Sequence, residues 1–276
     1  MDSLLPVKEY LLDATAHITV LTGAGVSAES GIPTFRGPEG YWTVGSRVYM
    51  PEEMATLEMF LQQPEEVWQW YLYRRGVCLK AVPNAGHLAL AEMEHYLGDR
   101  FSLITQNIDN LHIRAGSSLD RTYQIHGNAN FCRCSAGCSK RLYPLAKELD
   151  VERDKEELTG DEIRLLHCPN CDSWLRPHVL LFDEYYDEEY FRFESCMAIA
   201  AHTDLLIVVG TSGATNLPAQ VALTVSRNDK TIIDINIEEN PFSEMARNSR
   251  AGIVIHKSAA EVLPLLVGLF HCCPVN

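Results

Sequence analysis

The sequence predicts an α/β fold in which a doubly wound parallel sheet carries helices on both faces. Short, continuously apolar segments recur along the chain, and helical patterns lie between several of them. Strands covered on both faces have such unbroken apolar runs, and alternation of strands with helices is typical of parallel sheets. A chain of 276 residues is also long enough to bury a core without disulfide bonds.

The expected strands share β-branched and aliphatic residues. They are HITVLT at 17–22, FSLITQ at 101–106, LLIVVG at 205–210, TIIDIN at 231–236 and GIVIH at 252–256. Apolar residues at helical spacing predict helices at 84–97 and 258–269.

Two segments interrupt this alternation, so we expect three regions. Residues 1–35, 84–126 and 179–276 would form a Rossmann-like domain. Residues 36–83, rich in aromatic side chains, would form a helical insert, and residues 127–178, which hold a group of cysteines, a small zinc-binding module.

Composition excludes several classes of protein. The net charge is −14, from 37 acidic against 23 basic residues, which argues against a broad nucleic-acid surface. The longest C-terminal apolar run, 262–270, is far shorter than the ~20 residues that span a bilayer. The N-terminal segment lacks the features of a signal or transit peptide. We therefore expect a cytoplasmic protein that binds neither membrane nor nucleic acid.

A glycine-rich segment, GAGVSAESGIPTFRG at 23–37, follows the first expected strand. Glycines between a strand and a helix let backbone N–H groups approach a pyrophosphate. Ala28 stands where the third glycine of G-x-G-x-x-G would be, so on spacing alone a plain tight turn remains an alternative.

The cysteines predict a metal site. CPNC at 168–171 and CRCSAGC at 132–138 form two separated clusters, a pattern typical of tetrahedral zinc in a reducing compartment. Four thiolates leave no open position for water, so the zinc would be structural. Cys132, Cys134 and Cys138 compete for two of the four positions.

Four ordered motifs resemble the sirtuin family of NAD-dependent protein deacylases. GAGVSAESGIP with TFRG is similar to its first signature, and TQNIDNLHIRAG at 105–116 to its second. HG at 126–127 is the third motif, and GTS at 210–212 together with IN at 235–236 forms the fourth. The resemblance extends from about residue 18 to 265.

The resemblance implies that NAD is consumed as a co-substrate while an acyl group passes from lysine to ADP-ribose. His126 would act as general base, a task suited to a group that titrates near neutral pH, and Asn107 and Asp109 would line the nicotinamide side. The implied NAD contacts are Gly23, Ala24, Gly25, Ala28, Thr34, Phe35, Arg36, Tyr41, Trp42, Gln106, Asn107, Ile108, Asp109, Gly210, Thr211, Ser212, Asn236, Ile237, Glu238 and Ala259.

The family pattern also selects Cys134 and Cys138, with Cys168 and Cys171, as the zinc ligands. It matches HVLLFDE at 178–184 to a strand that binds the peptide by strand addition. The implied peptide contacts are His178, Val179, Leu180, Phe182, Asp183 and Glu184. Asp183 replaces a usual glycine, the 210–219 loop is one residue longer than usual, and Lys257 begins a loop that usually begins with glycine.

The helical stretch VWQWYLYRRG at 67–76 raises the question of acyl preference. Tyr71 and Arg74, three residues apart, share a helix face, and a hydroxyl with a guanidinium suits a carboxylate. The pair, with Thr34, resembles the subgroup that removes succinyl, malonyl or glutaryl groups. The alternative is a Trp/Tyr-rich helix packed on the core, with Arg74 and Arg75 solvated.

The expected partners are proteins or peptides that carry acylated lysine. ADP-ribosyl transfer, NAD hydrolysis and a non-catalytic NAD-binding scaffold remain alternative functions.

Overall fold

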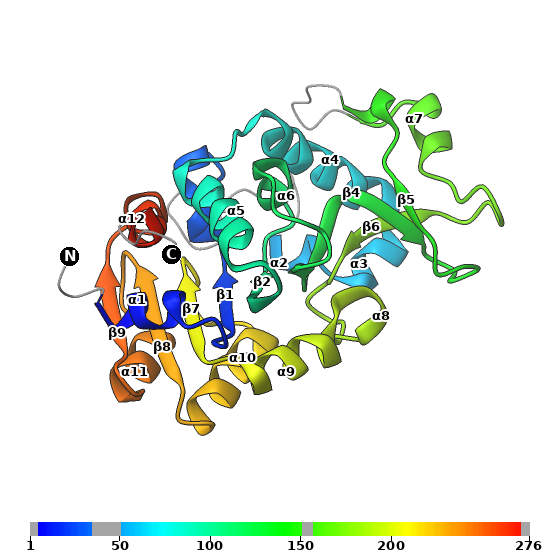
Figure 1. The fold of residues 1–276 in the computed structure, drawn as a ribbon. Helices are drawn as coiled ribbons and strands as arrows, with labels where there is room; N and C mark the ends of the chain where they lie inside the picture. The colour runs from blue at the N-terminus through cyan, green and yellow to red at the C-terminus, as the bar shows by residue number, and fades with distance from the viewer. Residues whose placement is uncertain (1–4, 35–50, 151–156, 272–276) are drawn as a thin grey trace.

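The computed structural model describes residues 5–34, 51–150 and 157–271. Its larger sheet has six parallel strands in the order β3-β2-β1-β7-β8-β9 (Figure 1). The strands are β1 (Ile18–Thr22), β2 (Phe101–Thr105), β3 (Thr122–Gln124), β7 (Leu205–Val209), β8 (Thr231–Asn236) and β9 (Ile253–His256). This order is that of a Rossmann sheet, so the predicted fold class is confirmed. All five expected strands are present.

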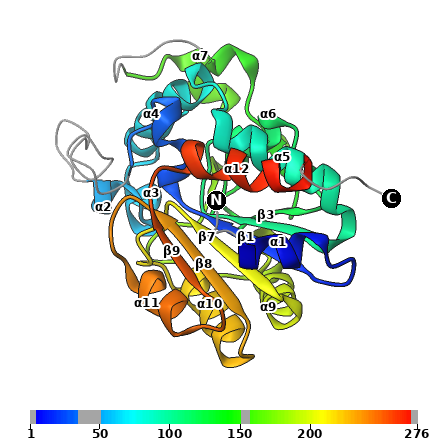
Figure 2. The same cartoon turned by 60° about the vertical axis from the view of Figure 1, so that its left-hand side comes forward.

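Helices cover both faces of this sheet (Figure 2). Apolar side chains of one face pack against α1, α5 and α12, and those of the other face against α9, α10 and α11. Their bounds are α1 (Leu5–Leu12), α5 (Ala85–Leu97), α9 (Phe193–His202), α10 (Asn216–Arg227), α11 (Pro241–Asn248) and α12 (Ala259–His271). Burial on both faces explains the unbroken apolar strand sequences.

A smaller antiparallel sheet has the strand order β5-β4-β6. It shares one apolar core with the helical insert, where the Trp68 indole donates to the Leu175 carbonyl at 2.7 Å. The bounds are α2 (Pro51–Met54), α3 (Leu57–Gln62), α4 (Pro64–Lys80), β4 (Gly127–Cys134), β5 (Leu142–Pro144) and β6 (Leu175–Val179). The remaining helices are α6 (Leu111–Ala115), α7 (Gly160–Leu165) and α8 (Glu188–Phe191). This shared core fixes α4 relative to the smaller sheet.

The helix expected after the first strand is present as a 3-10 helix, Ala24–Ser30. One local expectation needs correction. The expected strand at 178–184 ends at Val179, because the Phe182 N–H donates to the Ala55 carbonyl of the insert and not to a strand. In the part of the chain that the structure describes, no helix is long and apolar enough to cross a membrane.

Candidate active site

The candidate site begins where the chain reverses its direction of winding, between β1 and β7. Gly23 N–H donates to the Val209 carbonyl at 3.0 Å, and Gly25 N–H to the Gly210 carbonyl at 2.8 Å. A Cβ atom on Gly25 would lie 2.7 Å from Gly210 Cα. Glycine is therefore required for this close approach of two backbones. Ligands of such sheets bind at this crossing point, outside the carboxyl ends of the strands.

Predicted cofactor residues from the neighbouring strand ends converge on Thr211. The Gln106 amide donates to Thr211 Oγ1 at 3.0 Å, and the Asn236 amide donates to the Thr211 carbonyl at 2.9 Å. Residues that are 105 positions apart in the sequence thus become neighbours at one edge of the sheet.

The other predicted NAD contacts lie around this edge or beyond the described residues. Ala24 and Ala28 belong to the 3-10 helix, and Ala259 begins α12, whose Ala260 N–H donates to Glu29. Ile108 is partly buried, and Thr34 is the last described residue before a gap. Ser212, Ile237 and Glu238 are exposed. Phe35, Arg36, Tyr41 and Trp42 lie outside the described residues.

Ser27 joins the predicted nicotinamide-side residues into one buried cluster. The Ser27 hydroxyl donates to Asp109 Oδ2 at 2.7 Å and accepts from the Asn107 amide at 3.1 Å. Burial raises the pKa of Asp109, although the Leu111 N–H and Ser27 oppose the rise. His87 Nε2 lies 3.3 Å from the same hydroxyl, and burial lowers the His87 pKa to about 4. The cluster places a carboxyl and an amide side by side, away from water.

His126 contacts the backbone of Gln106 and is a neutral base. Its Nδ1 lies 3.0 Å from the Gln106 carbonyl, which can only accept, so Nδ1 carries the hydrogen. Nε2 therefore presents its lone pair, and Tyr186 Oη lies 2.7 Å from it. Burial lowers the pKa of His126 to about 4, below the near-neutral value expected from the sequence, and keeps the ring neutral at pH 7.

Tyr71 and Arg74 are buried, with 3% and 4% of their surfaces exposed. The Arg74 guanidinium lies 4.2 Å from the centre of the Trp70 ring and 5.8 Å from that of Tyr71. Burial raises the pKa of Tyr71 to about 12, so its hydroxyl keeps its proton. The alternative with a solvated Arg74 and Arg75 is wrong in that respect, because Arg75 is also buried and pairs with Asp150 and Asn130.

The predicted peptide segment holds the insert in place. The Asp183 carboxylate accepts from the N–H groups of Leu57 and Glu58, at 2.7 and 3.1 Å, so it caps the first turn of α3. Glu184 binds Arg176 through two parallel bonds of 2.6 and 2.7 Å. Both carboxylates are thus engaged within the chain, which gives Asp183 a structural reason to replace glycine.

The remaining peptide-segment residues are divided between the core and the surface. His178 is buried and stacks on Phe191, with ring centres 5.9 Å apart, and Val179 is buried. The Leu180 N–H donates to the His126 carbonyl at 3.0 Å, which ties this segment to the base. Phe182 has 55% of its surface exposed, so this residue of the segment lies at the surface.

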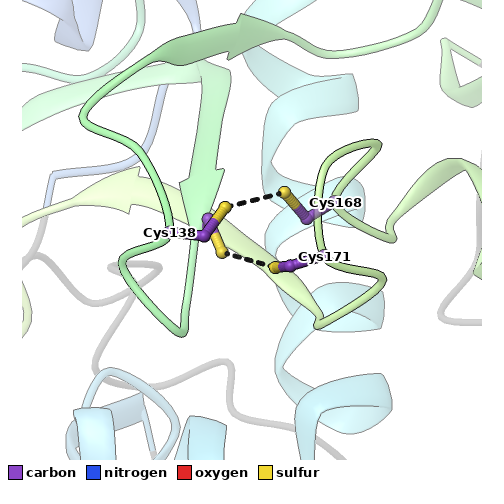
Figure 3. A group of neighbouring side chains, drawn as sticks. Cys138, Cys168 and Cys171 are labelled. Atoms are coloured by element: carbon purple, nitrogen blue, oxygen red, sulfur yellow. Dashed lines mark hydrogen bonds between the residues drawn. The ribbon is translucent and has the colours of Figure 1, made fainter.

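The four predicted zinc ligands form one group. Ligand atoms of Cys134, Cys138, Cys168 and Cys171 all lie within 4.8 Å of one another (Figure 3). The closest sulfur pairs, Cys134 with Cys171 and Cys138 with Cys168, are 3.5 Å apart. Tetrahedral zinc with Zn–S bonds of ~2.3 Å separates its sulfurs by ~3.8 Å. The group fits a structural zinc ion.

The extra thiol, Cys132, lies outside this group and donates to the Tyr143 carbonyl at 3.4 Å. Its sulfur is absent from the group of four ligand atoms that lie within 4.8 Å of one another. The structure thus assigns to Cys138 the ligand position for which Cys132 and Cys138 compete.

Sequence reasoning missed four residues that build the site: Ser27, His87, Tyr186 and Thr215. Ser27 lies inside GAGVSAESGIP, the segment that resembles the first sirtuin signature, so the motif could have identified it as a site residue. Tyr186 and Thr215 contact the site through the fold alone, since the Thr215 hydroxyl donates to Gln106 Oε1 at 2.8 Å across 109 positions.

The fold and the site define a Rossmann-type nucleotide-binding protein with a four-cysteine zinc module. The sequence pattern of the Sir2 family matches residues 23–216. The chain is 38% identical over 265 residues to an NAD-dependent protein deacylase of Leptospira interrogans, serogroup Icterohaemorrhagiae, serovar Lai. That match covers 95% of this chain and 97% of the relative. The chain therefore belongs to the Sir2 family.

Solved structures agree with this assignment. A Sir2 homologue in complex with NAD is 34% identical, with a TM-score of 0.79, over 97% of this chain and 94% of that one. A mutant Sir2 homologue in complex with ADP-ribose is 33% identical, with a TM-score of 0.81, over 99% and 98% of the two chains.

Proposed function

We propose that this Sir2-family chain removes short acyl groups that end in a carboxylate, such as succinyl, malonyl or glutaryl, from lysines of proteins or peptides. The broader activity follows from the family and its relatives: the chain is an NAD-dependent protein deacylase that uses NAD as co-substrate. The acyl preference rests on one observation, the burial of Tyr71 and Arg74 on the same helix.

The surroundings of this pair support a carboxylate reader. A guanidinium is charged at every physiological pH, and in a buried setting its attraction for a carboxylate is little screened. Tyr71 keeps a donor hydroxyl because of its raised pKa. Arg176 also acts on the Tyr71 hydroxyl, but Glu184 already binds Arg176 through both oxygens. We assign the acyl carboxylate to Arg74 because its guanidinium is buried three residues from Tyr71 on the same helix.

The proposed roles in catalysis follow from the contacts. NAD supplies an activated ribose, to which the acyl oxygen of lysine becomes bonded as nicotinamide leaves. His126, neutral and with its Nε2 lone pair presented, is suited to accept a proton from a ribose hydroxyl. Asn107 and Asp109, which both hydrogen-bond to Ser27, are suited to hold the carboxamide group of nicotinamide. Gly23, Gly25 and Gly210 let the segments after β1 and β7 pack backbone against backbone at this edge of the sheet.

Two other activities use the same ribose chemistry. ADP-ribosyl transfer and NAD hydrolysis need no reader for an acyl carboxylate, so the buried pair favours deacylation over both. A non-catalytic scaffold would not need a neutral base beside the cofactor edge, and it would release no nicotinamide. We also propose a cytoplasmic location, in keeping with a zinc site built from reduced thiols.

The test compares two arginine variants on one peptide that carries either acetyl-lysine or succinyl-lysine. Arg74→Met should reduce kcat/KM for the succinyl peptide by ~10-fold or more, because a charge-assisted hydrogen bond is worth ~1.5–3 kcal/mol. Its effect on the acetyl peptide should be within ~2-fold on the same physical argument.

Arg75→Met is the matched control. It removes a buried arginine from the same helix and breaks the contacts to Asp150 and Asn130, so it lowers stability without touching the acyl preference. Equal losses on both peptides in Arg74→Met, or the same preference change in Arg75→Met, would reject the carboxylate reader.

A further inference from the structure

The Nε2 atom of His126, the proposed base, already has a partner within the chain. Tyr186 Oη lies 2.7 Å from it, in the direction of the lone pair that must receive a proton. Because Nδ1 donates to the Gln106 carbonyl, Nε2 accepts and the tyrosine hydroxyl donates. A substrate hydroxyl that approaches His126 therefore meets this hydroxyl first or has to displace it.

The hydroxyl of Tyr186 belongs to a closed ring of contacts. The Thr215 hydroxyl interacts with Tyr186 and itself donates to Gln106 Oε1 at 2.8 Å. Gln106 then closes the ring, because its backbone carbonyl accepts from His126 Nδ1. The acceptor of the tyrosine hydrogen is His126 Nε2, 2.7 Å from Tyr186 Oη.

We propose that Tyr186 relays the proton of the ribose hydroxyl to His126; this inference rests on the proposed deacylase mechanism. The substrate O–H bond breaks, and its electron pair stays on the ribose oxygen, which bonds to the acyl carbon. The released proton binds Tyr186 Oη, while the Tyr186 hydrogen passes to His126 Nε2. Tyrosine is neutral before and after the step, and the positive charge ends on the imidazole. The Nε2–H group then donates to Tyr186 Oη.

The surroundings favour this concerted transfer over a tyrosinate. Burial raises the pKa of Tyr186, so the side chain holds a proton throughout. The titratable group that acts on Tyr186 from α9 is Cys196, which raises this pKa further. On the His126 side, burial lowers the pKa and the Gln106 carbonyl opposes the change. A neutral hydroxyl that accepts one proton from the ribose hydroxyl while it gives another to His126 stays uncharged.

The experiment separates the two halves of the reaction in the zinc-loaded full chain. With NAD and a succinyl-lysine peptide, nicotinamide release and formation of the deacylated peptide are measured in single turnovers. Tyr186→Phe should slow deacylation by ~100-fold or more, the range of a lost proton-transfer partner, and should slow nicotinamide release far less. Tyr185→Phe is the matched control, since Tyr185 is the adjacent residue and 91% of its surface is exposed.

A double variant distinguishes a relay from a packing role. If the proton passes through Tyr186 to His126, the variant His126→Ala with Tyr186→Phe should deacylate about as slowly as His126→Ala alone. Multiplied losses in the double variant, or a Tyr186→Phe enzyme as fast as Tyr185→Phe, would overturn the relay. In both of those cases the wild type still deacylates and His126→Ala is strongly slowed. Failure of the proposed function itself would instead give a wild type without acyl-dependent nicotinamide release, or a His126→Ala enzyme as fast as the wild type.

Discussion

Ser27 offers the sharpest test of how the site is held together. Its hydroxyl is 1% exposed and makes three polar contacts: it donates to Asp109, accepts from Asn107 and faces His87 Nε2. Ser27→Ala removes a hydrogen bond to a buried carboxyl, worth ~1.5–3 kcal/mol, and leaves two buried groups short of a partner. We expect the free energy of unfolding to fall by ~2–4 kcal/mol, because small rearrangements recover part of the loss.

Urea unfolding followed by tryptophan fluorescence measures this change. Ser30→Ala is the matched control, since Ser30 lies in the same 3-10 helix and accepts one bond, from the Asn84 amide at 3.0 Å. The control should lose about 1 kcal/mol or less. The reasoning is refuted if Ser27→Ala is as stable as Ser30→Ala, because the cluster would then not depend on the hydroxyl at its centre.

Three further predictions concern pH, zinc and the α3 cap. The His87 pKa of about 4 lies below the unfolded value of 6.5, so stability should be lost as pH falls from 6.5 towards 4. Between pH 7 and 5 His87 alone should lower the free energy of unfolding by ~2 kcal/mol, and His87→Gln should flatten urea midpoints measured over this range. Metal analysis should find one zinc per chain in wild type and Cys132→Ala but none in Cys168→Ala; zinc loss in Cys132→Ala would contradict the assigned ligand set. Asp183→Ala should lower stability by ~1 kcal/mol through loss of the α3 cap, and an unchanged urea midpoint would show that the cap is dispensable.

The parts of the fold that the sequence predicted are those governed by local pattern. Strand segments such as 205–210 are unbroken apolar runs because both faces of the sheet are covered, and that pattern is visible without the structure. The zinc ligands were also predictable, because spacing carries the signal. The exact assignment of Cys138 over Cys132 needed the structure, which buries Cys132 and directs its thiol to a carbonyl.

The contacts that the sequence did not predict join residues far apart in the chain. Tyr186 meets His126 across 60 positions, and no pattern within either segment indicates that pair. The burial of Arg74 and Arg75 was missed for a related reason: α4 packs against the smaller sheet, so polar side chains that resemble a solvated face are covered. The early end of β6 depends on a bond from Phe182 to the insert.

The central claim is that this chain is a deacylase that reads an acyl carboxylate. The most direct measurement is the NAD-dependent kcat/KM of the wild-type chain on two peptides of the same sequence, one with succinyl-lysine and the other with acetyl-lysine. A higher value for the succinyl peptide, with the acyl group recovered on ADP-ribose, is the predicted result. A higher value for the acetyl peptide would contradict the assignment of Tyr71 and Arg74.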